Sequence, residues 1–370
     1  MRPIINWTEQ NQTMQAEWGG DDRHPVPDHI EVIKQISAEQ ALRQFYQNTS
    51  LLWRGDYHQG KQLLAAIKKR VHSKAKVHND FHKHRLQQAQ HSRLFQRLLI
   101  EVRPDGHISN SRAPNVNAAL TDIFGLANKQ PLLIPLHLLQ GYISAHEWHK
   151  TGVIIPALNQ QKIHVPYGVF SPLRGEYLQL VAQAPLPAAC QHAWDIGTGS
   201  GVLAAILAQR GVPHIIATDN NPRAISCAQN NIERLGFKKQ ILIQQTNLFP
   251  DGHADLIICN PPWLPAKPSS SIETALYDPE HQMLKTFLNN AANHLNPHGQ
   301  IWLIMSDIAE HLGLRSPQAL NQWIAAAGLA LVRKSDIEPQ HPKAQQQHNP
   351  LAYARNQEIT SLWQLTVHSK

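Results

Sequence analysis

The sequence contains no apolar run that approaches the roughly 18–20 residues needed to cross a membrane as a helix. Its first residues, MRPIINWTEQNQ, are polar and lack the apolar core of a secretory signal. Cysteine is scarce: Cys190, Cys227 and Cys259 form no CxxC pair and no zinc-binding pattern. We therefore expect a cytoplasmic protein that has neither a disulfide framework nor a metal site.

Acidic residues are scarce in one part of the chain only. The segment 61–103 contains eleven lysines and arginines but only two acids, Asp80 and Glu101, so its formal charge is +9. The whole chain carries +7, which leaves −2 for all other residues. Such local charge indicates either a solvated helical surface or a contact with phosphate groups. We favour a nucleic acid as the partner, RNA rather than DNA, and keep a protein substrate as the alternative.

Helical patterns dominate the region before residue 150. Residues 1–30 are polar and contain several prolines, which predicts a flexible arm. The spacing of Ser37 and Gln40 predicts a capping box at a helix start, and apolar residues recur at helical spacing within 61–99. We therefore predict a mostly helical, basic N-terminal domain over 31–150, which would bind the substrate or RNA.

Predicted strands and helices alternate over residues 151–370. This alternation predicts an α/β domain with a doubly wound, mainly parallel sheet of seven strands. The last two predicted strands, 330–334 and 360–367, are joined by a polar stretch with no predicted helix. They should therefore pair antiparallel.

A glycine-rich turn, Asp195-Ile-Gly-Thr-Gly-Ser-Gly201, lies between a predicted strand and a predicted helix. Its glycines allow the backbone to turn sharply and a ligand to approach closely. Asp195 places a carboxylate where a cationic amine could be held. The alternative interpretation is a structural turn without a ligand.

An acid ends the next predicted strand. Asp219 is placed to accept hydrogen bonds from two ribose hydroxyls, as acids do in dinucleotide-binding folds. It could instead cap the helix that begins at Pro222, although Asn220 or Asn221 could take that role.

The string Asn260-Pro-Pro-Trp263 directly follows another predicted strand. Its two prolines stiffen the backbone and remove two N–H donors, which leaves the Asn260 side-chain oxygen and the Pro261 carbonyl as acceptors. Such an array suits a planar amino group, and Trp263 offers a flat face for stacking. The alternative is a rigid loop with a core tryptophan.

These three motifs, each at the carboxyl end of a strand, resemble those of class I S-adenosylmethionine-dependent methyltransferases. Ile257-Ile-Cys-Asn-Pro-Pro-Trp263 and Val165-Pro-Tyr-Gly-Val-Phe-Ser-Pro-Leu-Arg174 resemble motifs of the small-domain group. That group includes HemK-like glutamine methyltransferases, ribosomal RNA guanine methyltransferases and N6-adenine methyltransferases. The resemblance covers about residues 150–367 and implies a Rossmann-like fold, S-adenosylmethionine as the cofactor and methyl transfer to an NH₂ group.

The resemblance also implies residue roles. The implied cofactor-binding residues are Phe170, Arg174, Asp195, Gly197, Thr198, Gly199, Gly201, Asp219, Asn220, Asn247, Leu248 and Asn260. Asp195 and the glycines would hold the methionine part and Asp219 the ribose. Asn247 stands where the family has an acid near the adenine, so we expect weaker cofactor binding. The implied catalytic residues are Asn260, Pro261, Pro262 and Trp263, which would hold the substrate amine.

The implied reaction is a direct in-line transfer, in which the protein supplies proximity, orientation and hydrogen-bond acceptors. The basic segment favours a nucleic-acid base as the substrate, in ribosomal RNA. The alternative is a glutamine side chain in a protein such as a release factor. A non-catalytic RNA-binding module with a methyltransferase fold is a third hypothesis, against which the intact glycines, Asp219 and Asn260 argue.

Overall fold

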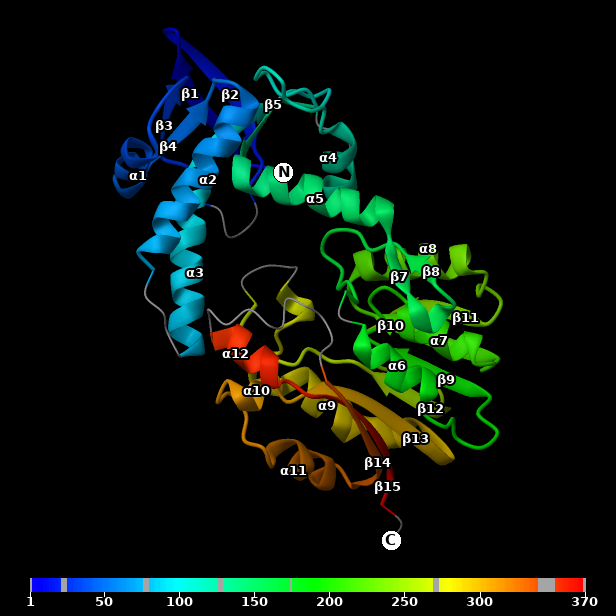
Figure 1. Ribbon diagram of the computed structural model, residues 1–370. Coiled ribbons are helices and arrows are strands. Elements are labelled where there is room, and N and C mark those ends of the chain that lie inside the picture. Colours follow the sequence, from blue (N-terminus) through cyan, green and yellow to red (C-terminus); the bar gives the residue numbers. More distant parts are fainter. Residues whose placement is uncertain are drawn as a thin grey trace. The chain divides into compact units, whose positions relative to one another are not determined.

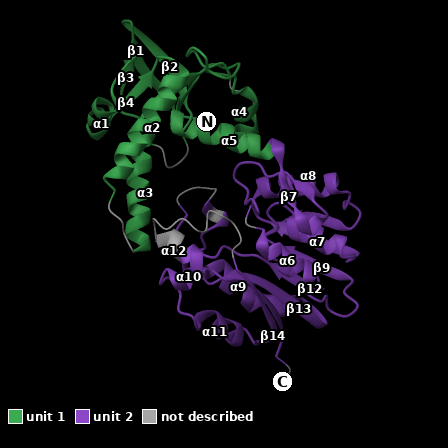
Figure 2. Ribbon diagram, viewed as in Figure 1, with its two compact units in different colours: residues 1–149 green, residues 150–370 purple. Residues whose placement is uncertain are grey.

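The computed structural model describes residues 2–20, 25–75, 80–125, 129–173, 175–268, 273–338 and 350–368. The chain divides into two compact units, residues 1–149 (unit 1) and 150–370 (unit 2), which Figure 2 colours separately. Each unit contains its own large sheet. No helix in the described ranges has the length and apolar character needed to span a membrane.

A mixed six-stranded sheet organises unit 1 (Figure 1). Its strand order is β1 (Ile4–Glu9), β2 (Gln12–Trp18), β6 (Leu132–Pro135), β5 (Leu98–Val102), β4 (Thr49–Trp53) and β3 (His29–Ile33). β1 and β2 form an antiparallel hairpin, β5 and β6 are antiparallel, and β3, β4 and β5 run parallel. All residues of β4 and β6 are buried, so these strands belong to the core of the unit.

Helices flank this sheet. They are α1 (Ala38–Tyr46), α2 (Tyr57–Ser73), α3 (Phe81–Phe95), α4 (Asn117–Phe124) and α5 (Leu136–Thr151). The predicted capping box is confirmed, because the Ser37 side chain accepts from the Gln40 N–H while the Gln40 side chain accepts from the Ser37 N–H. The side chains of Asp56 and Asp80 are the N-caps of α2 and α3, where each accepts from a backbone N–H of its helix.

The prediction of a mostly helical N-terminal domain is wrong, because this region is built on a six-stranded sheet. β4, β5 and β6 are short and almost continuously apolar, so they lack the alternation that distinguishes a half-buried strand from a helix. The helix predicted to run to about residue 99 ends at Phe95, and Leu98 and Leu99 begin β5.

The flexible arm predicted over residues 1–30 is also wrong for the part that forms β1 and β2. The buried side chains Ile5 and Trp7 alternate with exposed ones along β1, which is the pattern of a strand with one face on a core. Together with Trp18 of β2 they form an apolar cluster against Leu52 and Leu99. The polar composition therefore reflects the solvent-facing side of a hairpin and not disorder.

Unit 2 contains the predicted seven-stranded sheet. Its order is β11 (Ile241–Gln245), β10 (His214–Asp219), β9 (His192–Ile196), β12 (Ala254–Cys259), β13 (Leu295–Ser306), β15 (Thr360–Val367) and β14 (Leu329–Ile337). The first five strands are parallel, and β15 is antiparallel to both β13 and β14; the antiparallel pairing of β14 with β15 confirms the prediction. A small hairpin of β7 (Val153–Ile155), η1 (Pro156–Leu158) and β8 (Gln161–Ile163) precedes the sheet.

Two apolar clusters cover the two faces of this sheet. Alternate residues of each strand enter different clusters: Trp194 and Ile196 of β9 face one, whereas Ala193 faces the other. α6 (Glu176–Gln183), α7 (Val202–Gln209) and α8 (Pro222–Leu235) pack on the Ala193 side, and α9 (Gln282–Ala291) and α11 (Ala319–Ala326) pack on the Trp194 side. The remaining helical segments are η2 (Glu273–Ala275), η3 (Pro279–His281), η4 (Ala292–His294), α10 (Ile308–His311) and α12 (Pro350–Gln357).

The strand order changes direction at β9, which lies between β10 and β12. The chain moves to β10 on one side of β9 and to β12 on the other, so the connections leave β9 in opposite directions. Ile196 pairs with Thr218 of β10 and with Cys259 of β12, which brings the strand ends level. In open α/β sheets this position is where ligands bind.

A partly buried ion-pair network ties three parts of unit 1 together. Arg54, which follows β4, contacts Glu9 of β1 and Glu101 of β5, each at 2.5 Å. The exposed fractions of the three side chains are 13% for Arg54, 21% for Glu9 and 13% for Glu101. The hydrogen bond from Arg54 lowers the pKa of the Glu9 carboxyl, which indicates that the charged pair is favoured in the folded state.

We expect Arg54→Leu to lower the free energy of unfolding by about 3–5 kcal/mol, because it leaves two largely buried carboxylates without their cation. Urea denaturation followed by circular dichroism measures this loss. Arg43→Leu is the matched control, since Arg43 pairs with Glu39 on the surface of α1 and its loss should cost less than about 1 kcal/mol. Equal losses in the two variants would contradict the role of the network.

Candidate active site

The glycine-rich turn connects β9 to α7 in a backbone conformation that favours glycine. Gly197, Gly199 and Gly201 have φ values of 71°, 56° and 81°. A methyl group added at Gly199 would meet no atom within 4 Å, and one at Gly197 would meet only the Met283 side chain at 3.9 Å. At Gly201 it would press on Ala228 of α8 at 3.3 Å. The first two glycines thus border open space, whereas the third permits helix packing.

Hydrogen bonds between the turn and the neighbouring strand hold this geometry. The Thr198 N–H donates to the Thr218 carbonyl at 2.8 Å, and the Gly199 N–H donates to Asp219 Oδ2 at 3.0 Å. Asp219 Oδ1 accepts from the Asn221 N–H at 2.9 Å. Burial raises the pKa of Asp219 although these donors favour its charge. Asp219 therefore links β10 to the turn.

The cap of α8 is Asn221, which accepts from the Arg223 N–H at 3.0 Å. This contact decides between the two roles considered for Asp219 from the sequence. Because the helix already has its cap, Asp219 is not needed for that purpose and remains at the edge of the open space beside Gly199.

Asp195 is fully buried behind the turn. Its Oδ2 accepts from Thr198 Oγ1 at 2.6 Å and from the Ala204 N–H at 3.0 Å, whereas its Oδ1 has no hydrogen-bond partner among the described residues. Burial, with a smaller contribution from the charge of Asp219, raises the pKa of Asp195 to about 7. A buried carboxylate with one free oxygen fits a site that is completed by a cationic ligand.

Asn260 is held in place from two sides at the end of β12. Trp263 Nε1 donates to Asn260 Oδ1 at 3.0 Å, and Asn260 is hydrogen-bonded to the side chain of Tyr177 on α6. Burial raises the pKa of Tyr177, so its phenol stays neutral. The Trp263 ring packs against both apolar clusters of the sheet. The orientation of the Asn260 amide is therefore set before any substrate arrives.

Tyr177 is the residue of this site that sequence reasoning missed. It lies on a helix 83 positions before Asn260, and no motif or spacing relates the two. The buried position of Tyr177 in α6 could be predicted from helical periodicity, but its partner is decided by how α6 packs over β12.

Two loops approach the same edge of the sheet. Arg223 Nη1 donates to the Tyr167 carbonyl at 2.8 Å, which holds the segment before Phe170 against the start of α8. Thr218 Oγ1 donates to the Leu248 carbonyl at 2.7 Å, and Leu248 has a φ of 63°. Phe170 is half-buried, and Asn220 and Asn247 are exposed. Arg174 lies outside the described residues.

The hydrogen bonds bring Asp195, Thr198, Gly199 and Asp219 into one connected group. The pairing of β9 with β12 places Asn260, Pro261, Pro262 and Trp263 at the neighbouring strand end. Within the described ranges no three His, Cys, Asp or Glu side chains gather into a metal-binding group.

The sheet order and the glycine-rich turn between two acids give unit 2 a Rossmann-like fold of the kind found in class I S-adenosylmethionine-dependent methyltransferases. More narrowly, residues 162–327 match the family model described as methyltransferase small domain. S-adenosylmethionine is the methyl donor of this family.

Relatives with assigned activities match part of the chain. The chain is 30% identical over 153 residues to a release factor glutamine methyltransferase of Cereibacter sphaeroides, a match that covers 37% of this chain and 52% of the relative. It is 31% identical over 150 residues to a ribosomal protein uL3 glutamine methyltransferase of Neisseria gonorrhoeae (37% and 50%). It is 30% identical over 157 residues to a tRNA1(Val) (adenine(37)-N6)-methyltransferase of Tolumonas auensis (40% and 63%). The chain thus spans roughly half the length of these curated relatives.

We expect the stability of the ligand-free protein to fall as pH rises from about 4 to about 7. Over this range the folded protein keeps a proton on Asp195, with its pKa near 7, whereas the unfolded chain has already lost it near 3.8. Asp195→Asn removes this titration. The free energy of unfolding of the variant minus that of the parent protein should therefore increase by up to about 4 kcal/mol between pH 4 and pH 8. Urea denaturation at several pH values measures it, and a difference independent of pH would contradict the buried charge.

Proposed function

We propose that this protein methylates the side-chain amide of a glutamine residue in a protein, with S-adenosylmethionine as the methyl donor. The observation that carries the proposal is the fixed Asn260 amide, held by Trp263 and Tyr177 at the end of β12. A glutamine acceptor is supported by two relatives, which are named as glutamine methyltransferases of release factors and of ribosomal protein uL3.

The turn between β9 and α7 is the proposed cofactor site. Asp219 borders the open space beside Gly199 and would accept from the ribose hydroxyls. Asp195 is fully buried, so we assign it to holding Thr198 and placing negative charge behind the turn, where it favours a cationic ligand. The exposed Asn247 and the Leu248 backbone would border the adenine, and Phe170 would cover the cofactor from the neighbouring loop.

The proposed acceptor site uses the Asn260 side-chain oxygen and the Pro261 carbonyl. Both would accept from a planar NH₂ group, which orients its nitrogen and stabilises the positive charge that develops there during transfer. When bound, S-adenosylmethionine supplies a methyl group on a cationic sulfur. The acceptor nitrogen would take this methyl group while Asn260 and Pro261 hold it, and its extra proton would leave to solvent. Tyr177 stays neutral and therefore positions Asn260 without acting as a base.

A nucleic-acid base is the second candidate acceptor. An exocyclic amine of a base is also a planar NH₂ group, and the basic segment 61–103 supports an RNA partner. The name of the relative that acts on a tRNA adenine is consistent with this candidate. None of the three relatives named above acts on ribosomal RNA, so a base in ribosomal RNA stays a prediction from the sequence.

The deciding experiment is the transfer of a radiolabelled methyl group from S-adenosylmethionine into separated protein and RNA fractions of a cell extract. We expect label in a protein band, at a glutamine, and a rate at least about 100-fold lower for Asn260→Ala because an acceptor aimed at the reacting nitrogen is lost. Equilibrium dialysis should show nearly unchanged cofactor binding by this variant.

The outcomes of this experiment separate the candidates. Label in RNA that disappears in Asn260→Ala would replace the glutamine proposal with the base proposal. Cofactor binding without label in either fraction would favour the non-catalytic module.

Tyr177→Phe tests the positioning role of the phenol. We expect kcat to fall about tenfold, since Asn260 loses one of its two anchors, while the KM for the cofactor and the shape of the pH profile stay the same. Trp263→Phe, which removes the other anchor but keeps an aromatic ring, should have a similar effect. The loss of one limb of the pH profile in Tyr177→Phe would instead identify a catalytic base.

A further inference from the structure

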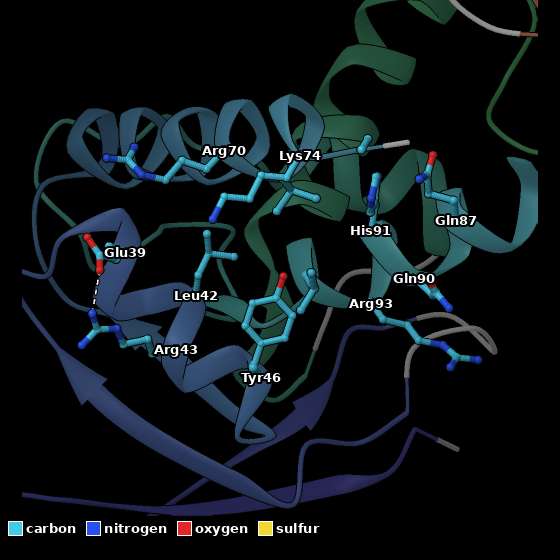
Figure 3. A pocket seen from close by; sticks show the side chains of 13 residues that line it. Glu39, Leu42, Arg43, Tyr46, Arg70, Lys74, Gln87, Gln90, His91 and Arg93 are labelled. Carbon is cyan, nitrogen blue, oxygen red and sulfur yellow. Dashed lines mark hydrogen bonds and ion pairs between the residues drawn. The ribbon is translucent and has the colours of Figure 1, made fainter. Parts of the chain in front are cut away.

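A hollow between three helices of unit 1 is lined by cations. The cavity has a volume of about 720 Å³ and lies between α1, α2 and α3 (Figure 3). Arg70 and Lys74 belong to the end of α2, and Arg93 belongs to the end of α3. Glu39 is the one acid among the described lining residues, and it pairs with Arg43 at 2.6 Å. The carboxylate on this surface is thus already neutralised.

The cations are not explained by contacts within the protein. All three side chains of Arg70, Lys74 and Arg93 are exposed, and within the described ranges no ion pair joins them to an acid. Cations in the last turn of a helix gain only about 0.3–1 kcal/mol from the helix dipole. That gain does not account for a +9 charge over residues 61–103. A surface of this kind attracts a polyanion.

The hollow also presents groups that recognise flat, polar ligands. Tyr46, the last residue of α1, has an exposed fraction of 70%. Figure 3 shows Tyr46 and Lys74 pointing into the hollow from opposite sides, with Arg70 and Arg93 toward its two ends. Gln87 and Gln90 of α3 lie one helical turn apart on a third side. An exposed aromatic ring beside cations is the combination with which proteins hold unpaired bases.

We propose that this hollow binds an unpaired segment of RNA, with its phosphates on Arg70, Lys74 and Arg93 and a base stacked on Tyr46. Folded RNA regularly contains unpaired segments, whereas DNA is mostly double-stranded. A membrane surface fits poorly, because Tyr46 and Leu86 are the large apolar side chains exposed on α1, α2 and α3. The inference concerns unit 1 and does not depend on which amino group unit 2 methylates.

Fluorescence anisotropy of a labelled single-stranded RNA of about twelve nucleotides, titrated with the full chain without cofactor, tests the proposal. We expect the triple variant Arg70→Gln, Lys74→Gln, Arg93→Gln to lose affinity at least about 30-fold at low salt. The slope of log K against log salt should become shallower by about 2, because each phosphate contact on a single strand contributes about 0.7. The matched control replaces three exposed cations of unit 2, Arg234, Lys239 and Arg333, by glutamine.

Tyr46 provides an independent test that leaves the charge unchanged. Tyr46→Ala should weaken binding about tenfold, and Tyr46→Trp should retain it, because stacking on one base contributes about 1–3 kcal/mol. The melting temperature of the triple variant should not fall, since it removes repulsion between exposed cations. Unchanged RNA binding by the triple variant, an equal loss in the unit 2 control, or equally tight binding of polyglutamate would each overturn the proposal.

Discussion

The hydrogen bond from the Gly199 N–H to Asp219 is the contact on which the candidate active site depends. It joins the turn after β9 to the end of β10, and three glycines in left-handed conformation allow the backbone to reach it. Asn221, which caps α8, and the loop that carries Leu248 are attached to the same strand end. The open space beside the turn is a consequence of this arrangement, because the absence of side chains at the first two glycines leaves it unfilled.

The same arrangement brings Asp219 close enough to Asp195 to disfavour the charge of Asp195. Asp195 and Asp219 both have raised pKa values, and burial is the main cause for each. Such sites are stabilised when a cation or a set of hydrogen-bond donors binds beside the carboxylates. For this reason, strongly shifted pKa values are common where ligands bind. At the proposed acceptor site, hydrogen bonds with Tyr177 and Trp263 set the orientation of the Asn260 amide in advance.

The two units differ in how they place buried and charged residues. Unit 2 buries both faces of its mainly parallel sheet, and its candidate active site lies at the edge where the carboxyl ends of the strands meet. Unit 1 holds Glu9 and Glu101 in partly buried contact with Arg54, and it exposes cations such as Arg70 and Arg93 that pair with no acid among the described residues. A charge distribution of this kind costs stability in the free protein and is compensated by a polyanionic partner. Glutamine methylation of an RNA-bound protein would use both units.

The sequence by itself determined the architecture of unit 2 and the position of its polar groups, because alternating strands and helices place every motif at a strand end. It also determined the local charge of residues 61–103 and the cap at Ser37. Tertiary structure alone decided the six-stranded sheet of unit 1, the contact of Tyr177 with Asn260 and the hollow that faces Tyr46. The reason is physical: caps, turns and periodicity arise from neighbouring residues, whereas short buried strands and contacts between distant helices depend on packing that leaves no local pattern.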